Sequence, residues 1–325
     1  MRCIVTGGAG YIGSHLAEKL LAQNHEVTIL DSFYTGSLKN ISHLIGRKHF
    51  ELKIGCVLDR SIVEDLVKDS DIVFHLAAIV GVKNVTNNPL KTIIVNMSGS
   101  QNIFKLSYKY NRRVIFTSTS EVYGINPKTP FSEESQRVLG STNIKRWAYS
   151  SAKSLAEHLG IAFYDIGLPI TILRLSSCYG PRITTQGSVI ARFIINALKE
   201  APIIIHGNGE QTRPFTYVDD TVRGIIMASK NKKALGEIFN IGNKKSVNIL
   251  KLAKLIKKIT GSKSSIQFIR PEKEYGENFQ DIKKRKIATS KALDILNFEA
   301  KVTLEKGLGK TVSWFKEEEK NISTL

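Results

Sequence analysis

The 325-residue chain has few of the residues that cross-link secreted proteins or span membranes. It contains only three cysteines, and Cys3, Cys56 and Cys178 lie far apart, so a disulfide framework is disfavoured. No apolar run reaches the roughly 20 residues that a membrane-spanning helix needs. The N-terminus leads directly into a short strand, without a leader-like apolar segment. We therefore expect a cytoplasmic protein with no membrane partner.

Acidic residues are scarce relative to basic ones, since 29 Asp and Glu stand against 47 Lys and Arg, a formal net charge of +18. Clustered basic residues would indicate nucleic-acid binding, because Lys and Arg neutralise phosphates. Here the lysines are spread thinly, with short runs at 230–233, 251–258 and 283–286 and no recognised nucleic-acid motif. A solvated basic surface is favoured, no nucleic-acid partner is expected, and an anionic small substrate would gain from this field.

The N-terminal segment has the order of a dinucleotide-binding unit. An apolar strand at 2–6 runs into a glycine-rich turn, a periodic helix follows, and a second strand ends in Asp31. In such units the amides of the helix N-terminus bind a pyrophosphate, and the acid binds the ribose hydroxyls. The glycine spacing is G-x-x-G-x-x-G. The residues expected to bind the dinucleotide here are Gly7, Gly10, Tyr11, Ile12, Gly13 and Asp31. Because Asp31 would repel a 2′-phosphate, NAD is favoured over NADP.

Alternating strands and helices continue through the first half of the chain. Strands are predicted at 50–54, 72–76, 114–118 and 170–175, and helices at 61–68, with Ser61 as N-cap, 89–110 and 149–164. This order predicts an α/β protein with a doubly wound parallel sheet covered by helices on both faces. His75, inside an apolar strand, is expected to be a satisfied core residue.

Ligands of such sheets bind beyond the carboxyl ends of the strands. The loops after Thr6, Leu30, Leu76, Ser118 and Leu175 should therefore open on one cleft, with the small residues after the fourth strand close to the ligand. That position adds Leu76, Ala77 and Ala78 to the expected cofactor contacts. From about Ser176 the elements become short and irregular. We expect a dinucleotide-binding domain at 1–175 and a smaller α/β substrate domain at 176–325, with interleaving segments allowed, helices at 188–199, 219–229, 248–259 and 304–319, and a polar loop at 271–285.

A tyrosine and a lysine, Tyr149 and Lys153, stand four residues apart and share one face of the predicted helix. A positive neighbour lowers the pKa of a phenol, which makes a tyrosine a usable base near neutral pH. Such pairs occur by chance on many helices. Beside a dinucleotide site, however, the pair predicts oxidation of a hydroxyl, because a base must stand next to the hydride acceptor.

These motifs, with Thr119, resemble the extended short-chain dehydrogenase/reductase family, the NAD-dependent epimerases and dehydratases of nucleotide sugars. The similarity covers essentially the whole chain, including 180–182, 207–209 and 215–220. It implies a Rossmann-type fold, bound NAD, oxidation of a sugar at C4, and a homodimer formed through helices 89–110 and 149–164. It assigns the base to Tyr149, the lowering of its pKa and the nicotinamide ribose to Lys153, and a hydrogen bond to the reacting oxygen to Thr119.

The loop Thr119-Ser120-Glu121 lacks the Asp-Glu pair of the 4,6-dehydratases and is similar to UDP-glucuronate decarboxylases. Arg146-Trp147 and the segment Tyr275-Gly276 to Arg285 resemble the same enzymes. A sugar oxidised at C4 and carrying a C5 carboxylate is a β-keto acid, which loses carbon dioxide readily. Bidentate Arg146 and Arg285 would bind the carboxylate. The remaining expected roles are proton supply at Ser120 and Glu121, and substrate contacts at Ser177, Arg182 and Arg213.

Two positions depart from the family pattern. Ser177 replaces an Asn that contacts the sugar nucleotide, and Cys56 replaces an Asp near the adenine. We predict decarboxylation of UDP-glucuronate to UDP-xylose or a UDP-4-keto-pentose, a lyase activity with no metal. The main alternative is an isomerase, a 4-epimerase of UDP-glucose or UDP-glucuronate, which would not need Glu121 or two carboxylate-binding arginines. A non-catalytic NAD sensor and a nucleic-acid binder are more distant alternatives.

Overall fold

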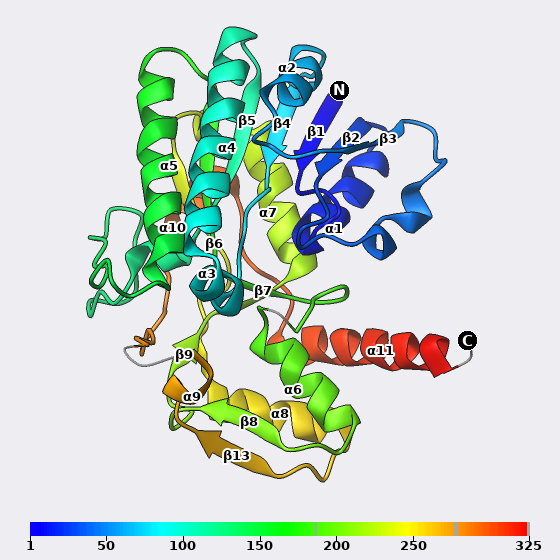
Figure 1. Ribbon diagram of the computed structural model, residues 1–325, viewed down its shortest axis with the longest axis vertical. Helices are drawn as coiled ribbons and strands as arrows, with labels where there is room; N and C mark the ends of the chain where they lie inside the picture. The colour runs from blue at the N-terminus through cyan, green and yellow to red at the C-terminus, as the bar shows by residue number, and fades with distance from the viewer. Residues whose placement is uncertain (186, 276–278, 324–325) are drawn as a thin grey trace.

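The computed structural model describes residues 1–185, 187–275 and 279–323, with side chains described as far as Glu318; Gly276 lies outside these ranges. Seven strands form one parallel sheet in the order β11-β6-β5-β4-β1-β2-β3. Figure 1 shows this sheet lobe above a smaller lobe. The sheet strands are β1 (Arg2–Thr6), β2 (Glu26–Asp31), β3 (Phe50–Ile54), β4 (Ile72–His75), β5 (Arg113–Thr119), β6 (Ile170–Leu175) and β11 (Ile238–Ile241).

Helices cover both faces of the sheet, as the strand patterns predict. On one face lie α2 (Arg60–Lys68), α4 (Pro89–Lys109) and α5 (Trp147–Asp165), and on the other α1 (Tyr11–Leu21) and α7 (Val218–Lys230). Alternate residues of one strand serve the two cores. In β1, Cys3 and Val5 pack with α1, whereas Ile4 packs with α2 and α4. The predicted fold class, a doubly wound Rossmann-type sheet, is confirmed.

The smaller lobe carries short elements around a continuation of the core. It contains α6 (Val189–Leu198), α8 (Ile249–Thr260), α11 (Leu304–Ser323) and the parallel pair β8 (Ile203–His206) and β13 (Ile266–Ile269). The remaining helices and strands are short: α3 (Val82–Asn87), β7 (Ser177–Tyr179), β9 (Thr212–Arg213), β10 (Phe215–Tyr217), β12 (Val247–Asn248), α9 (Glu272–Tyr275) and α10 (Ser290–Leu296). In the part of the chain that the structure describes, no helix is both long and apolar enough to cross a membrane.

Two local expectations need correction. The N-cap of α2 is Asp59 and not Ser61, because the Asp59 carboxylate accepts hydrogen bonds from the amides of Ser61 (3.0 Å) and Ile62 (3.3 Å). The segment expected to be a loop at 271–285 contains the helical turn α9. The two predicted domains interleave, as the sequence analysis allowed, because α7 and β11 come after residue 175 and pack on or pair with the sheet.

His75 is a core residue, as expected. Its Nδ1 is 2.8 Å from the Thr6 hydroxyl and its Nε2 is 3.0 Å from the Ser100 hydroxyl. Burial, followed by the nearby Lys153, holds the pKa of His75 well below its ordinary value, so the ring is neutral.

Asp220 ties the C-terminal segment to helix α7. Its buried carboxylate accepts hydrogen bonds from Arg223 (2.6 Å) and from the amides of Lys301 (2.9 Å) and Val302 (2.8 Å). We expect Asp220→Ala to lower the free energy of unfolding by about 2 kcal/mol, because the donors lose their acceptor. Urea denaturation measures this loss. The exposed neighbour Asp219, changed to Ala, should cost less than about 0.5 kcal/mol; equal losses would mean that helix charge and not the buried bonds is responsible.

Candidate active site

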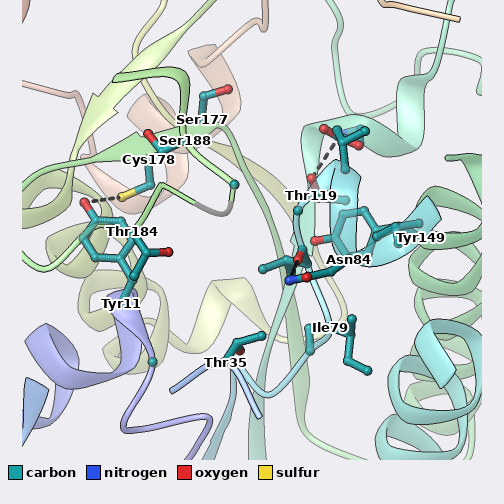
Figure 2. A pocket seen from close by; sticks show the side chains of 18 of the residues that line it. Tyr11, Thr35, Ile79, Asn84, Thr119, Tyr149, Ser177, Cys178, Thr184 and Ser188 are labelled. Atoms are coloured by element: carbon teal, nitrogen blue, oxygen red, sulfur yellow. Dashed lines mark hydrogen bonds between the residues drawn. The ribbon is translucent and has the colours of Figure 1, made fainter. Parts of the chain in front are cut away.

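A cavity of about 1030 Å³ lies between the two lobes, at the carboxyl ends of the sheet strands. Residues from all five predicted loops line it: Gly7, Asp31, Ala77, Thr119 and Ser176. Figure 2 shows Thr119 and Tyr149 on one side of this cavity and Tyr11, Ser177 and Cys178 on the other. The expectation of a single cleft at the strand ends therefore agrees with the structure.

The glycine-rich turn brings backbone against backbone at the N-terminus of α1. Gly7 has φ +71°, and a Cβ there would lie 2.8 Å from the amide nitrogen of Ala77. A Cβ on Gly13 would overlap the carbonyl oxygen of Gly7. Only glycine fits either position, so the spacing of the motif follows from the close packing of the turn, the helix and β4. The first turn of α1, with Tyr11 and Ile12, then faces the cavity.

Asp31 ends β2 at the same edge. Its carboxylate accepts hydrogen bonds from the amides of Ala9 (2.9 Å) and Phe33 (2.8 Å), which fix its orientation. Burial raises the pKa of Asp31, while these amides oppose that change. A fixed carboxylate beside a helix N-terminus and a side-chain-free cradle fits a dinucleotide that carries a free ribose diol. Leu76, Ala77, Ala78 and Cys56 also line this part of the cavity.

Helix α5 carries Tyr149 and Lys153, and both side chains line the cavity. Lys153 is buried, and its Nζ donates a 2.9 Å hydrogen bond to the carbonyl of Thr117. Burial lowers the pKa of Lys153 to about 7, although Glu157 acts in the opposite direction. Burial, with Glu121, raises the pKa of Tyr149, while Thr119 and Arg285 act in the opposite direction. In the protein without cofactor, the pKa of Tyr149 is therefore raised, and the lowering expected from Lys153 is not seen.

Three arginines from distant parts of the chain meet two carboxylates in the cavity. Arg285 Nη2 lies 3.2 Å from Glu121 Oε1, and Arg213 Nη2 and Arg146 Nη1 lie 2.7 and 3.3 Å from Asp281 Oδ1. Burial would raise the pKa of Glu121, yet Arg285, Arg146 and Arg213 together hold it below its ordinary value. The cluster has one more cation than anion, which favours an anionic ligand.

Some donors in this cluster have no partner among the described residues. They are the buried Nε groups of Arg146 and Arg285, and the buried Ser120 hydroxyl also lacks one. Buried N–H groups are costly to leave unpaired, so a ligand carboxylate would satisfy them. The cluster is therefore chemically suited to bind an anion next to Tyr149.

One predicted substrate residue lies elsewhere. Arg182 does not line the cavity; its Nη1 pairs with Glu18 at 2.9 Å and approaches the Ser14 hydroxyl at 3.4 Å. Ser177 does line it. Sequence reasoning missed the lining residues Lys83, Asn84, Arg192, His206, Glu274 and Asp281. Arg192 had a readable signal, since it is the only charged residue in the predominantly apolar helix 189–198.

Comparison with known proteins agrees with this geometry. The profile of the NAD-dependent epimerase/dehydratase family matches residues 3–242. UDP-N-acetyl-alpha-D-glucosaminuronate decarboxylase of Bacillus cytotoxicus is 42% identical, over 97% of this chain and 98% of the relative. UDP-glucuronic acid decarboxylase 1 of Xenopus tropicalis is 36% identical, over 98% and 72%. The crystal structure of UDP-glucuronic acid 4-epimerase from Bacillus cereus, with UDP-glucuronic acid and NAD, superposes with a TM-score of 0.88 at 31% identity, covering 98% of this chain and all of that one.

The glycine cradle gives a direct test of cofactor binding. We expect Gly13→Ala to weaken NAD binding by at least about tenfold, because the added methyl group displaces the turn from the helix. Isothermal titration with NAD measures the affinity. Gly309→Ala is the matched control, since a Cβ at Gly309 in α11 meets no atom within 4 Å. An affinity unchanged in Gly13→Ala would contradict the assignment of this turn to NAD.

Proposed function

The chain belongs to the NAD-dependent epimerase/dehydratase family, and on this premise we propose that it decarboxylates a UDP-linked hexuronic acid. The observation that carries the proposal is the arginine cluster. Arg146 and Arg285 have unpaired buried Nε groups and line the same cavity as Tyr149. A neutral hexose carries no carboxylate to accept from the Nε groups of Arg146 and Arg285.

The residues divide between two chemical stages. The glycine cradle and Asp31 would hold NAD, which would supply the hydride acceptor for C4 of the sugar. Tyr149 takes the proton of the C4 hydroxyl, Thr119 hydrogen-bonds the same oxygen, and the charge on Lys153 favours the phenolate. Lys153 also holds the nicotinamide ribose. These assignments extend the family resemblance to the residues that line the cavity.

Decarboxylation then breaks the C5–C6 bond of the 4-keto sugar. Arg146 and Arg285 hold the carboxylate that leaves as carbon dioxide, and the electron pair passes into an enolate at C4–C5. We assign delivery of the proton at C5 to Glu121 and Ser120, with the Ser120 hydroxyl as the donor because the arginines lower the pKa of Glu121. We assign binding of the diphosphate to Arg213. Ser177 contacts the sugar nucleotide. Arg182 is not retained in this scheme, since Glu18 pairs with it outside the cavity.

The substrate class leaves two candidates that differ at C2. The X. tropicalis relative is named for UDP-glucuronic acid, whereas the B. cytotoxicus relative is named for the 2-acetamido analogue. We propose UDP-glucuronate as the first substrate. The product would be UDP-xylose if the hydride returns to C4, or a UDP-4-keto-pentose if the cofactor leaves in its reduced form. We propose the 2-acetamido analogue as the second candidate substrate. The higher identity to the B. cytotoxicus relative and the small side chain of Ser177 support it.

Two further expectations stay predictions. Exposed apolar side chains on the outer faces of α4 and α5, among them Leu90, Ile94, Leu155 and Tyr164, favour a homodimer formed through these helices. Sedimentation equilibrium at micromolar concentration would distinguish a dimer from a monomer. A cytoplasmic location remains an expectation from the sparse cysteines.

The proposed reaction is tested by incubating the protein with NAD and each of the two UDP-uronates, followed by mass spectrometry. We expect loss of carbon dioxide from at least one of them, and abolition of that loss in Tyr149→Phe because the base is removed. A product of unchanged mass but inverted C4 would mean a 4-epimerase. Persistent turnover in Tyr149→Phe would contradict the assignment of the base.

The carboxylate role of Arg285 makes a separate prediction. We expect Arg285→Ala to lower kcat/KM for the uronate by about 100-fold, or about 2.7 kcal/mol, because a buried charged pair is lost. The affinity for UDP-glucose, which lacks the carboxylate, should change less than about threefold. Arg60→Ala, at an exposed position of α2, is the matched control. Equal losses with the uronate and with UDP-glucose would exclude a carboxylate-specific role.

A further inference from the structure

A third ionisable residue follows Tyr149 and Lys153 on the same face of α5. Glu157 stands four residues after Lys153, so the three side chains succeed one another along the helix toward β5 and β6. Lys153 and Glu157 are both almost fully buried, with 1% and 2% exposure. Two buried charges one turn apart need an account, because charged side chains are costly to bury.

The Glu157 carboxylate is held from two strands of the sheet. Arg174 on β6 donates from Nε (3.0 Å to Oε1) and from Nη2 (2.8 Å to Oε2). Ser118 on β5 donates its hydroxyl proton to Oε1 at 2.5 Å. These bonds fix the rotamer of Glu157, and Arg137 Nη1 lies 3.9 Å from its Oε2. A buried ion pair of this kind is a weak source of stability compared with apolar packing, which points to a role other than stability.

The other end of Arg174 reaches the loop that carries the proton-delivery residues. Its Nη1 donates to the Tyr123 hydroxyl (3.0 Å) and to the carbonyl of Glu133 (2.7 Å). Tyr123 ends the 3₁₀ turn Ser120–Tyr123, in which Glu121 stands. One guanidinium therefore connects the helix that bears Lys153 with the turn that bears Glu121.

Lys153 itself has little else to stabilise its charge. Its hydrogen bond goes to a neutral carbonyl, at Thr117 on β5, and the Phe116 ring lies 4.5 Å from Nζ. His75 on β4 is neutral, and Tyr149 on α5 is an un-ionised phenol in the free protein. Among the described residues, Glu157 is the anion that raises the pKa of Lys153 against the effect of burial.

We propose that Glu157 is a positioning residue that keeps Lys153 protonated, and that Arg174 holds Glu157 in place and aligns the Glu121 turn with it. This inference rests on the proposed role of Lys153 as the cationic partner of Tyr149. It adds a buried relay of Lys153, Glu157 and Arg174. Of these three residues, only Lys153 lines the cavity. The relay makes the charge of the catalytic lysine depend on a residue that the substrate never contacts.

The test is the pH dependence of Glu157→Gln, which removes the negative charge and keeps the size of the side chain. Without the anion, Lys153 should lose its proton at a lower pH. The alkaline limb of the kcat profile should therefore move to lower pH by about one unit, with KM nearly unchanged. Asp220→Ala is the matched control, because it also breaks buried hydrogen bonds but lies outside the cavity, and its limb should stay in place.

A second readout needs no turnover. The ¹³Cε resonance of Lys153, assigned by its loss in Lys153→Met, is followed against pH in the cofactor-free protein. We expect a titration midpoint well below those of the surface lysines, and a further decrease in Glu157→Gln. If wild-type protein turns over neither uronate, the proposed function fails, while this titration still decides the relay.

A variant that does not fold has a replacement. The pair Glu157→Leu with Arg174→Met removes both charges, so Arg174 is not left as a buried cation without its anion. It should move the Lys153 midpoint in the same direction by a smaller amount, because the nearer of the two charges lost is the anion. Unchanged kcat limbs and an unchanged Lys153 midpoint in the folded variants would overturn the proposal.

Discussion

Removal of water from charged groups at the carboxyl edge of the sheet is the constraint on which the rest of this protein depends. Asp31, Lys153 and Arg285 end up buried there, and Glu121 partly buried, because parallel strands covered on both faces leave only their ends open. Each charge must then be fixed by a neighbour. Amides fix Asp31, Arg285 pairs with Glu121, and Glu157 opposes the loss of the proton on Lys153.

The two ends of the cavity solve this problem in different ways. The dinucleotide end uses backbone, with a glycine turn and strand-end amides that carry partial charges and need no counter-ion. The sugar end uses side chains, with three arginines against two carboxylates and two Nε groups still unpaired among the described residues. The first arrangement suits a cofactor that stays bound. The second suits an anion that arrives and leaves, since its charge replaces a missing partner.

Motifs that lie within a short segment of the chain could be predicted from the sequence. The glycine turn, α1 and Asp31 lie within the first 31 residues, and a single strand–helix–strand unit explains their spacing. Tyr149 and Lys153 were readable because helical periodicity alone puts them on one face. The error at Ser61 has a similar local cause, because Asp59 offers a better acceptor two residues earlier.

The sequence by itself determined the parallel sheet, the dinucleotide turn, the cofactor preference set by Asp31 and the Tyr–Lys pair, because each follows from short-range periodicity and backbone sterics. Only the tertiary structure decided which arginines share the cavity. It brought Arg146, Arg213 and Arg285 together from three separate segments and sent Arg182 to Glu18 instead. It also decided how burial raises the pKa of Tyr149, because burial depends on what packs around a side chain and no spacing of residues encodes it.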